Sequence, residues 1–245
     1  MNMHGHTLDN HPEASAATPS SWRRLAIIAT LLFLGGVAAC IADVPVARLT
    51  VNNRHDAFAI SDFSRFLRAG GYLPVWLVVG AALIAERQGK ARAVRGVMRS
   101  PGAWLIASTI LAGVCAEAMK LLVRRKRLTR DINWYDFRPF DQNTFDTGGL
   151  SLPSSHVIIA FAAAFALGRA YPATRWILIP LAVGTAFSRV QMGAHYVSDA
   201  YASALFAWPC AWCVCRLLRP AENAARVAPA SGKPLRVKGM PTYAP

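Results

Sequence analysis

The chain has 245 residues, of which 54% are hydrophobic and only 16% are charged. This balance is wrong for an ordinary soluble domain of that length and indicates an integral membrane protein. The formal net charge of +14 raises the question of a nucleic-acid partner. However, the basic residues flank apolar segments and no nucleic-acid motif accompanies them, so we expect no nucleic acid, and anionic lipid head groups as partners.

Six apolar segments are long enough, or nearly so, to cross a bilayer as helices. A span needs about 20 mostly apolar residues, and the candidates lie, in chain order, at 25–42, 71–85, 102–119, 156–171, 176–190 and 198–218. The predicted fold is therefore all-α, a polytopic membrane helical bundle with about six transmembrane helices. We expect one domain over 22–219, between disordered tails at 1–21 and 220–245.

Lys and Arg residues near the span ends predict the orientation of the chain. They gather in the N-terminal flank, the loop 86–99 and the C-terminal tail, which places these three segments on the cytoplasmic side. Segments 43–70, 120–155 and 191–197 then lie on the opposite face. The segment 120–138 departs from this rule, because it carries seven Lys and Arg residues on the outer side. Such an exception calls for a function.

Two of the outer segments carry residues that suit an anion. Lys120 and Arg127 are seven residues apart, about two helical turns, so a continuous helix would place both cations on one face. The run SLPSSH, which ends at His156, combines a Pro and a Ser cap, both helix-start signals, with the hydroxyls of Ser154 and Ser155. A helix N-terminus is an anion site, so we expect an anion within reach of His156.

The third outer segment, SRVQMGAHYVSD at 188–199, places three more polar side chains at the membrane edge. His195 and Asp199 are four residues apart, so on the first turn of the last helix the carboxylate can accept a hydrogen bond from one imidazole nitrogen. That bond fixes the tautomer and raises the basicity of the other nitrogen. Gly193 permits a turn that lets Arg189 point at the same pocket. Together the three segments predict a phosphate cradle with one histidine as nucleophile and a second as acid.

Each feature also has a plain structural interpretation. An HxxxD pair is usually structural, a serine-rich helix start is usually a cap, and a basic run beside a membrane usually meets lipid head groups. The CxxCxC in the last span lacks a fourth ligand, so we expect no metal and no cofactor. The apolar run that ends at Cys40 resembles a lipoprotein signal, although a first transmembrane helix is the favoured interpretation. A catalytic site is favoured because all three segments share one face and use the only two histidines at span ends.

These segments resemble the motifs of a known family. Type-2 phosphatidic acid phosphatases and vanadium haloperoxidases form a superfamily with the patterns KxxxxxxRP, PSGH and SRxxxxxHxxxD. This chain has KLLVRRKRL at 120–128, PSSH at 153–156 and the full third pattern at 188–199. The resemblance covers roughly residues 60–217 and points to the bacterial membrane lipid phosphatase branch.

The resemblance implies a role for each motif residue. His195 would attack phosphorus, Asp199 would orient it, and His156 would protonate the leaving oxygen. The phosphoryl oxygens would be bound, together with the backbone N–H of Ser155, by Lys120, Arg127, Ser154 and Arg189. Fixed cations and N–H donors of this kind stabilise the transferring group without a metal. Glu117, one turn before Lys120, is expected to pair with it.

Two positions depart from the family pattern. Leu128 stands where the family has proline, which should loosen the turn after Arg127. Ser155 stands where the family has glycine, and its side chain adds bulk where the backbone must approach phosphate. The change at Ser155 could slow the reaction, alter the preferred head group or abolish turnover. Outside the motifs, Arg138 is expected to contact the substrate head group.

The leading hypothesis is an integral membrane phosphatase in a bacterial inner membrane, with its active site facing the periplasm. It would hydrolyse a lipid phosphate or pyrophosphate through a phosphohistidine intermediate, and phosphatidic acid, phosphatidylglycerophosphate, undecaprenyl pyrophosphate and lipid A types all fit. Two alternatives stay open. One is a lipid phosphotransferase that uses the same residues, and the other is a non-catalytic membrane protein that binds anionic lipid.

Overall fold

The structure is a computed structural model, and the residues that it describes are 19–51, 58, 61–88, 94–128 and 135–218. Within these ranges the regular elements are helical, and extended pairing is limited to two isolated bridges. The predicted all-α class is therefore confirmed. The predicted tails lie outside the described residues, apart from residues 19–21, which are already part of the first helix.

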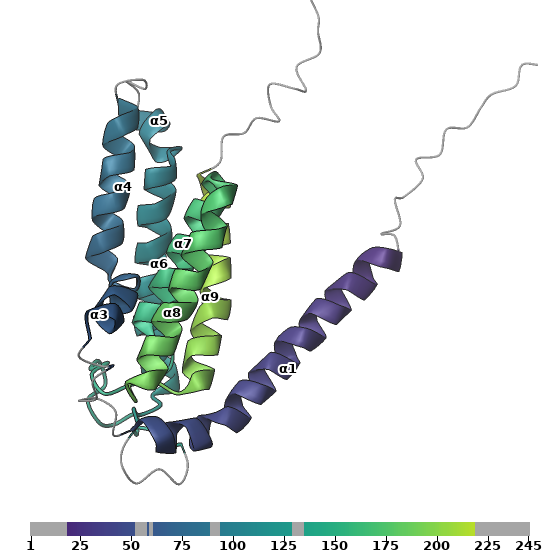
Figure 1. Ribbon diagram of the computed structural model, residues 1–245, viewed down its shortest axis with the longest axis vertical. Helices are drawn as coiled ribbons and strands as arrows, with labels where there is room; N and C mark the ends of the chain where they lie inside the picture. Colours follow the sequence, from purple (N-terminus) through teal and green to yellow (C-terminus); the bar gives the residue numbers. More distant parts are fainter. Residues whose placement is uncertain (1–18, 52–57, 59–60, 89–93, 129–134, 219–245) are drawn as a thin grey trace, which may run out of the picture.

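The helices follow one another along the chain as labelled in Figure 1. Their bounds are α1 Pro19–Thr50, α3 Asp62–Ala69, α4 Leu73–Gln88, α5 Val94–Met98, α6 Pro101–Val123, α7 Ser155–Ala170, the 3-10 turn η2 Pro172–Thr174, α8 Arg175–Gln191 and α9 Val197–Leu217. Each of the six predicted spans coincides with one of the long helices, namely α1, α4, α6, α7, α8 and α9.

The number of membrane crossings is a separate matter. Among the described residues, α1 and α6 are long and apolar enough to span a bilayer, and the pair α3 and α4, bent by 58°, would add a third span. Helices α7 and α8 have 16 and 17 residues, so each is about 25 Å long, short of a hydrocarbon core of about 30 Å. Six long helices are present among the described residues, but six spans are not confirmed.

Helix α7 forms the centre of the bundle and packs against α6, α8 and α9. Its buried face is rich in alanine, and residues such as Ala162 and Ala163 are fully buried. Small side chains let helix backbones approach closely, which is how helices commonly pack within membranes. Larger apolar residues from neighbouring helices, Trp76 and Leu105 among them, complete this core.

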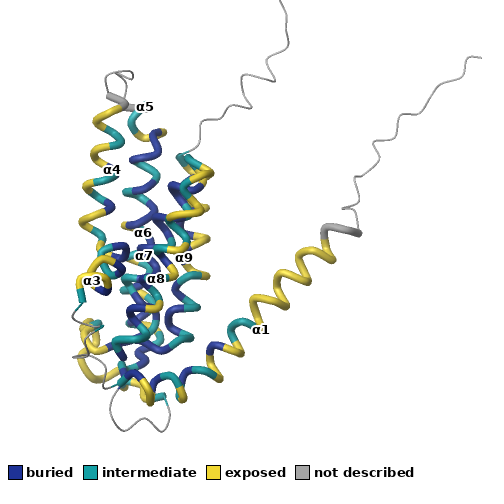
Figure 2. Tube along the Cα trace, viewed as in Figure 1, coloured by how far each residue is buried: buried dark blue, intermediate teal, exposed yellow. Residues whose placement is uncertain are grey.

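Helix α1 differs from the other helices. Its N-terminal part diverges from the bundle, and most of its length is exposed (Figures 1 and 2). It contacts α9 where the Tyr201 hydroxyl donates to the Leu32 carbonyl at 2.7 Å and the Tyr201 ring lies over Gly35. An exposed apolar helix of this kind suits a lipid environment.

One end of the bundle gathers the chain segments predicted to carry the site. The last turns of α6 and α8 and the first turns of α7 and α9 meet at the lower end of Figure 1, beside the segments 124–128 and 135–154. The predicted convergence of the three motif segments on one face is therefore present in the fold.

Candidate active site

Helix α6 ends because Arg124 adopts a left-handed conformation, with a φ of 58°. Its guanidinium donates to three carbonyls of the following loop, those of Arg138, Thr144 and Gln142. These bonds stabilise a backbone conformation that non-glycine residues rarely adopt. Arg124 is 1% exposed, so this cation of the basic run serves the loop and not lipid head groups.

Beyond Arg124 the chain is extended and no longer helical. The Arg127 N–H donates to the Gly149 carbonyl at 2.9 Å, and the Ser151 N–H donates to the Arg125 carbonyl at 2.7 Å. The prediction that Lys120 and Arg127 share one helical face is therefore wrong. The helix stops between them, and hydrogen bonds to the 149–151 segment place Arg127 instead.

Leu128, which replaces the family's proline, is buried. It is 4% exposed and packs with Ala47 and Tyr196. Leucine thus supplies apolar contacts at this position, while the rest of the turn that was expected to be looser lies outside the described residues. Ala47 comes from the C-terminal part of α1, which therefore packs against Leu128.

His195 is 2% exposed and lies just before α9. Its Nδ1 atom is 2.9 Å from the Ser151 carbonyl oxygen. A carbonyl can only accept a hydrogen bond, so Nδ1 carries the hydrogen and Nε2 keeps a lone pair. This is the tautomer that a nucleophilic Nε2 requires.

Asp199 holds a different position from the one predicted. Helix α9 begins at Val197, after His195, so the two residues do not share a helical turn. The Asp199 carboxylate accepts from the Tyr196 N–H at 2.9 Å and from Arg125 at 3.0 Å, and it lies 3.7 Å from His195 Nδ1. At 3.7 Å the predicted hydrogen bond is not made, because Asp199 accepts from Tyr196 and Arg125 while Nδ1 of His195 faces the Ser151 carbonyl.

Cations surround the imidazole of His195. Burial lowers the pKa of His195 below its ordinary value of 6.5, Asp199 opposes that effect, and the charges of Arg189 and Arg127 lower the pKa further. The ring is therefore neutral near pH 7, as a nucleophile must be. Arg189 lies in the last turn of α8, and the turn after it contains Gly193 with a φ of 60°, as predicted.

His156 is the second residue of α7 and faces the turn between α3 and α4. The Tyr72 ring lies 6.2 Å from its ring, and a Cβ atom on Gly71 would come within 2.5 Å of its carbonyl oxygen. The charges of Arg189, Lys120 and Arg68 act on it, as does His195. The two histidines and all three predicted phosphate-binding cations are thus brought together.

Sequence reasoning missed Arg68. It lies in α3 outside the three motif segments, and only its place in the predicted outer segment 43–70 could have drawn attention to it. Because Arg68 acts on His156, it adds a cation to those that surround this histidine.

The Lys120 ammonium makes a closed triangle of hydrogen bonds. It donates to Glu117 at 2.7 Å and to the Ser155 hydroxyl at 2.6 Å, and that hydroxyl donates to Glu117 at 2.7 Å. The predicted pairing of Glu117 with Lys120 is confirmed. Ser155, the residue that departs from the family's glycine, holds one of the three donors of Lys120.

Ser154 is the N-cap of α7, as predicted, but its side chain makes no capping hydrogen bond. Its N–H donates to the Ser203 hydroxyl at 2.8 Å. Its own hydroxyl is buried and has no partner among the described residues. A buried hydroxyl without a partner costs about 1–3 kcal/mol, and a ligand oxygen at the helix N-terminus would satisfy it.

Arg138 bonds within its own loop. Its guanidinium donates to the carbonyls of Asp146 and Gly148 and pairs with the Asp146 carboxylate at 3.6 Å. A contact between Arg138 and a substrate head group stays a prediction.

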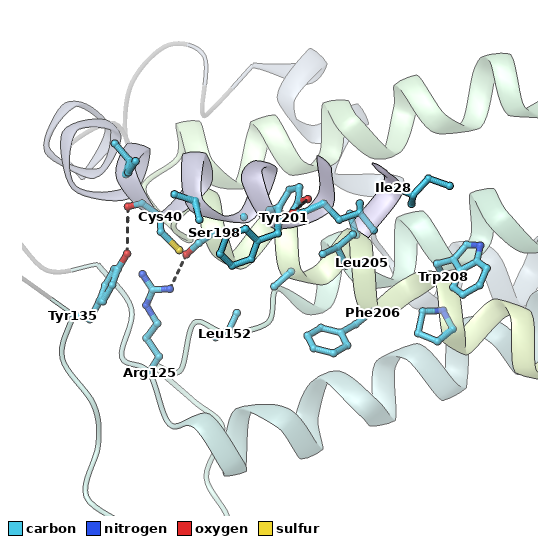
Figure 3. Close-up of a pocket in the computed structure, with 18 of the residues that line it drawn as sticks. Ile28, Cys40, Arg125, Tyr135, Leu152, Ser198, Tyr201, Leu205, Phe206 and Trp208 are labelled. Carbon is cyan, nitrogen blue, oxygen red and sulfur yellow. Dashed lines mark hydrogen bonds between the residues drawn. The ribbon is translucent and has the colours of Figure 1, made fainter. Parts of the chain in front are cut away.

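An apolar cavity of about 1680 Å³ lies between α1 and α9 (Figure 3). Ile28, Leu205 and Trp208 are among the apolar residues that line it, and Arg125 and Tyr135 lie at its polar end.

Among the described residues no group of three His, Cys, Asp or Glu side chains could hold a metal ion.

Comparison with known proteins identifies the family. A model of the PAP2 superfamily matches residues 101–222. The lipid A 1-phosphatase of Rhizobium johnstonii is 35% identical over 113 residues, which are 44% of this chain and 44% of that protein. The lipid A 1-phosphatase of Rhizobium etli is 34% identical over 110 residues, 43% of this chain and 45% of that protein.

The chain therefore spans less than half the length of these curated relatives. No solved structure matches it. The matched segment contains all three motifs on which the resemblance rests, and through residues 101–222 the chain belongs to the PAP2 superfamily.

Proposed function

We propose that this protein is a membrane phosphatase that hydrolyses a lipid phosphate or pyrophosphate through a phosphohistidine intermediate. The observation that carries the proposal is the convergence of His195 and His156 with Lys120, Arg127 and Arg189 at one end of the bundle. Buried or half-buried cations gathered in this way are poised to bind a multiply charged anion.

In the first step Nε2 of His195 attacks phosphorus with its lone pair. The bond between phosphorus and the lipid oxygen breaks, and His156 in its protonated form gives that oxygen a proton. The Ser151 carbonyl accepts the Nδ1 hydrogen of His195 at 2.9 Å and so holds the ring as positive charge develops on it.

In the second step water attacks the phosphohistidine. His156, now neutral, takes a proton from the water, the bond between phosphorus and nitrogen breaks, and inorganic phosphate leaves. The cations, the α7 N-terminus and the unpartnered hydroxyl of Ser154 stabilise the negative charge in both steps. Neither step requires a metal ion.

A lipid substrate is favoured by the setting of the site. The relatives are lipid A 1-phosphatases, and the apolar cavity beside candidate span α1 suits acyl chains. We propose a phosphorylated lipid A or a similar membrane lipid as the substrate, an inner-membrane location, and a site that opens to the periplasm.

The experiment that tests the proposal is phosphate release by the purified protein in detergent with EDTA present. The panel contains lipid A, phosphatidic acid, phosphatidylglycerophosphate and undecaprenyl pyrophosphate, and His195→Ala is assayed in parallel. We expect release by the wild type and a loss of at least about 10³-fold in the variant. Turnover that depends on an added divalent metal, or near-normal turnover by His195→Ala, would contradict the proposal.

A phosphotransferase is the second candidate. Hydrolysis and transfer share the phosphohistidine, and activity without a metal is expected of both. The burial of His195, which is 2% exposed, favours transfer in one respect, because it limits access by water. Adding a second lipid with a free hydroxyl to the assay separates the two. Transfer of ³²P to that lipid instead of to water would establish transfer.

A further inference from the structure

Asp43 is a buried carboxylate in the C-terminal part of an apolar helix. It lies in α1, whose most apolar window is only 6% buried, and yet Asp43 itself is 0% exposed. Charged groups in such helices are costly and mark functional or paired positions. Asp43 lies outside the matched family segment of residues 101–222, so the family motifs assign it nothing.

Four hydrogen bonds satisfy the Asp43 carboxylate. It accepts from the Arg125 guanidinium at 3.0 Å, from the Tyr135 hydroxyl at 2.8 Å and from the Ser198 N–H at 2.8 Å. The fourth bond comes from the Ser198 hydroxyl. Asp43 thereby joins α1 to the basic segment after α6 and to the first turn of α9.

Arg125 is the centre of this cluster and is 5% exposed. One of its terminal nitrogens donates to Asp43, and the other donates to Asp199 at 3.0 Å and to the Ser198 hydroxyl at 2.8 Å. Its guanidinium also lies over the rings of Tyr135 and Tyr196, at 3.8 and 3.9 Å from their centroids. A planar fork clamped in this way has little freedom to move.

Arg125 reaches His195 by two routes. Its side chain holds Asp199, which lies 3.7 Å from His195 Nδ1. Its backbone carbonyl accepts from the Ser151 N–H at 2.7 Å, and the Ser151 carbonyl accepts the Nδ1 hydrogen of His195 at 2.9 Å. One residue therefore fixes both groups that face Nδ1.

We propose that Arg125, held by Asp43 of α1, is a positioning residue that sets the tautomer and orientation of the His195 imidazole. The inference rests on the proposed function for its effect on turnover, although it concerns the state of His195 with or without turnover. Neither residue touches the phosphoryl group. They act through Asp199 and Ser151.

The charges around His195 determine whether its titration midpoint rises or falls when Asp43 is replaced. The groups that act on His195 are Asp199 from α9, Arg189 from α8, Arg127 from the segment after α6, and His156 from α7. Replacing Asp43 by asparagine removes one negative charge and directs Arg125 wholly to Asp199. Both changes disfavour the imidazolium of His195, so its titration midpoint should fall.

The first test compares turnover in three variants. Asp43→Asn and Arg125→Lys should each lower kcat about tenfold or more while KM stays within about twofold, since ground-state binding of the phosphoryl group is untouched. Asp43→Glu keeps the charge but moves the carboxylate by one methylene. It should restore the pH profile of the wild type without restoring kcat.

Asp62→Asn is the matched control for this series. Asp62 pairs with Arg65 on the exposed surface, and its side chain is 96% exposed. The control should keep the wild-type kcat and pH profile. If Asp43→Asn and Arg125→Lys also keep wild-type kcat, or lose stability with an unchanged kcat and pH profile, the cluster is merely structural and the inference is overturned.

The second test does not depend on turnover. Protein with ¹⁵N-labelled histidine is examined by NMR, and the His195 signals are assigned from their absence in His195→Ala. The wild type should show a protonated Nδ1 and an unprotonated Nε2, and Arg125→Lys should show a mixture of tautomers. Asp43→Asn should titrate at a lower pH, by about half a unit or more. A wild type with a protonated Nε2 would overturn the inference, even if the protein released no phosphate from any lipid.

Discussion

Two polar clusters flank the same site, and they are built differently. The cluster of Lys120, Glu117 and Ser155 is open on one side, with the Glu117 side chain 46% exposed. In the cluster of Asp43, Arg125 and Asp199, both carboxylate side chains are 0% exposed and that of Arg125 is 6% exposed. The first can exchange partners with an incoming anion, whereas the second has fixed partners that water does not reach. The difference lies in the carboxylate partners, since the Lys120 side chain is itself only 7% exposed, close to the 6% of Arg125.

The largest effect should follow from removing the cation of the buried cluster. Arg125→Met leaves the carboxylates of Asp43 and Asp199 buried without their common partner, so we expect a loss of about 3–5 kcal/mol in the free energy of unfolding. Thermal unfolding in detergent measures it. A variant as stable as the wild type would show that the two clusters do not differ in this way.

The pH dependence of turnover should reflect the lowered pKa of the buried His195. Because the pKa of His195 lies below 6.5, neutral His195 persists as the pH falls through 6.5. The acid limb of kcat/KM should therefore have its midpoint below 6.5, and the rate should fall about tenfold per pH unit beneath it. Assays from pH 4.5 to 8 locate the limb. An acid limb with its midpoint at or above pH 6.5 would mean that burial does not lower the pKa of His195.

The open cluster should respond more mildly. Ser155→Gly frees one Lys120 donor and lets the backbone approach phosphate, so KM should fall about three- to tenfold with a smaller change in kcat. Ser155→Ala is the matched variant, since it removes the hydroxyl and keeps Cβ. Equal effects of both changes assign the penalty to the hydroxyl that holds Lys120, and an effect of glycine alone assigns it to bulk. An unchanged or raised KM in both would contradict the exchange of partners.

The smallest effect is expected for an ion pair outside both clusters. Lys126 pairs with Asp136 at 2.8 Å, with side chains 39% and 68% exposed. Lys126→Ala should change the free energy of unfolding by less than about 1 kcal/mol, because water screens exposed pairs. A larger loss would show that the whole basic run, and not Arg125 in particular, supports the site.

The local signals in the sequence proved reliable where they were read from one segment. All six apolar segments are helices, α7 begins in the serine-rich run with Ser154 at its N-cap position, Gly193 makes the turn and Glu117 pairs with Lys120. Predictions failed where they assumed that a helix continued. Arg127 does not share a helical face with Lys120, because Arg124 ends α6, and His195 does not share one with Asp199, because α9 begins after it.

The sequence by itself determined the helical class, the family and the residue types of the site, because apolar run length and motif spacing are properties of neighbouring residues. Only the tertiary structure decided which partners those residues have. Asp43 meets Arg125 across 82 residues and Ser198 across 155, and no local pattern encodes contacts between segments so far apart. Packing of α1 against the site supplies them, because a buried carboxylate must find its donors wherever the fold places them.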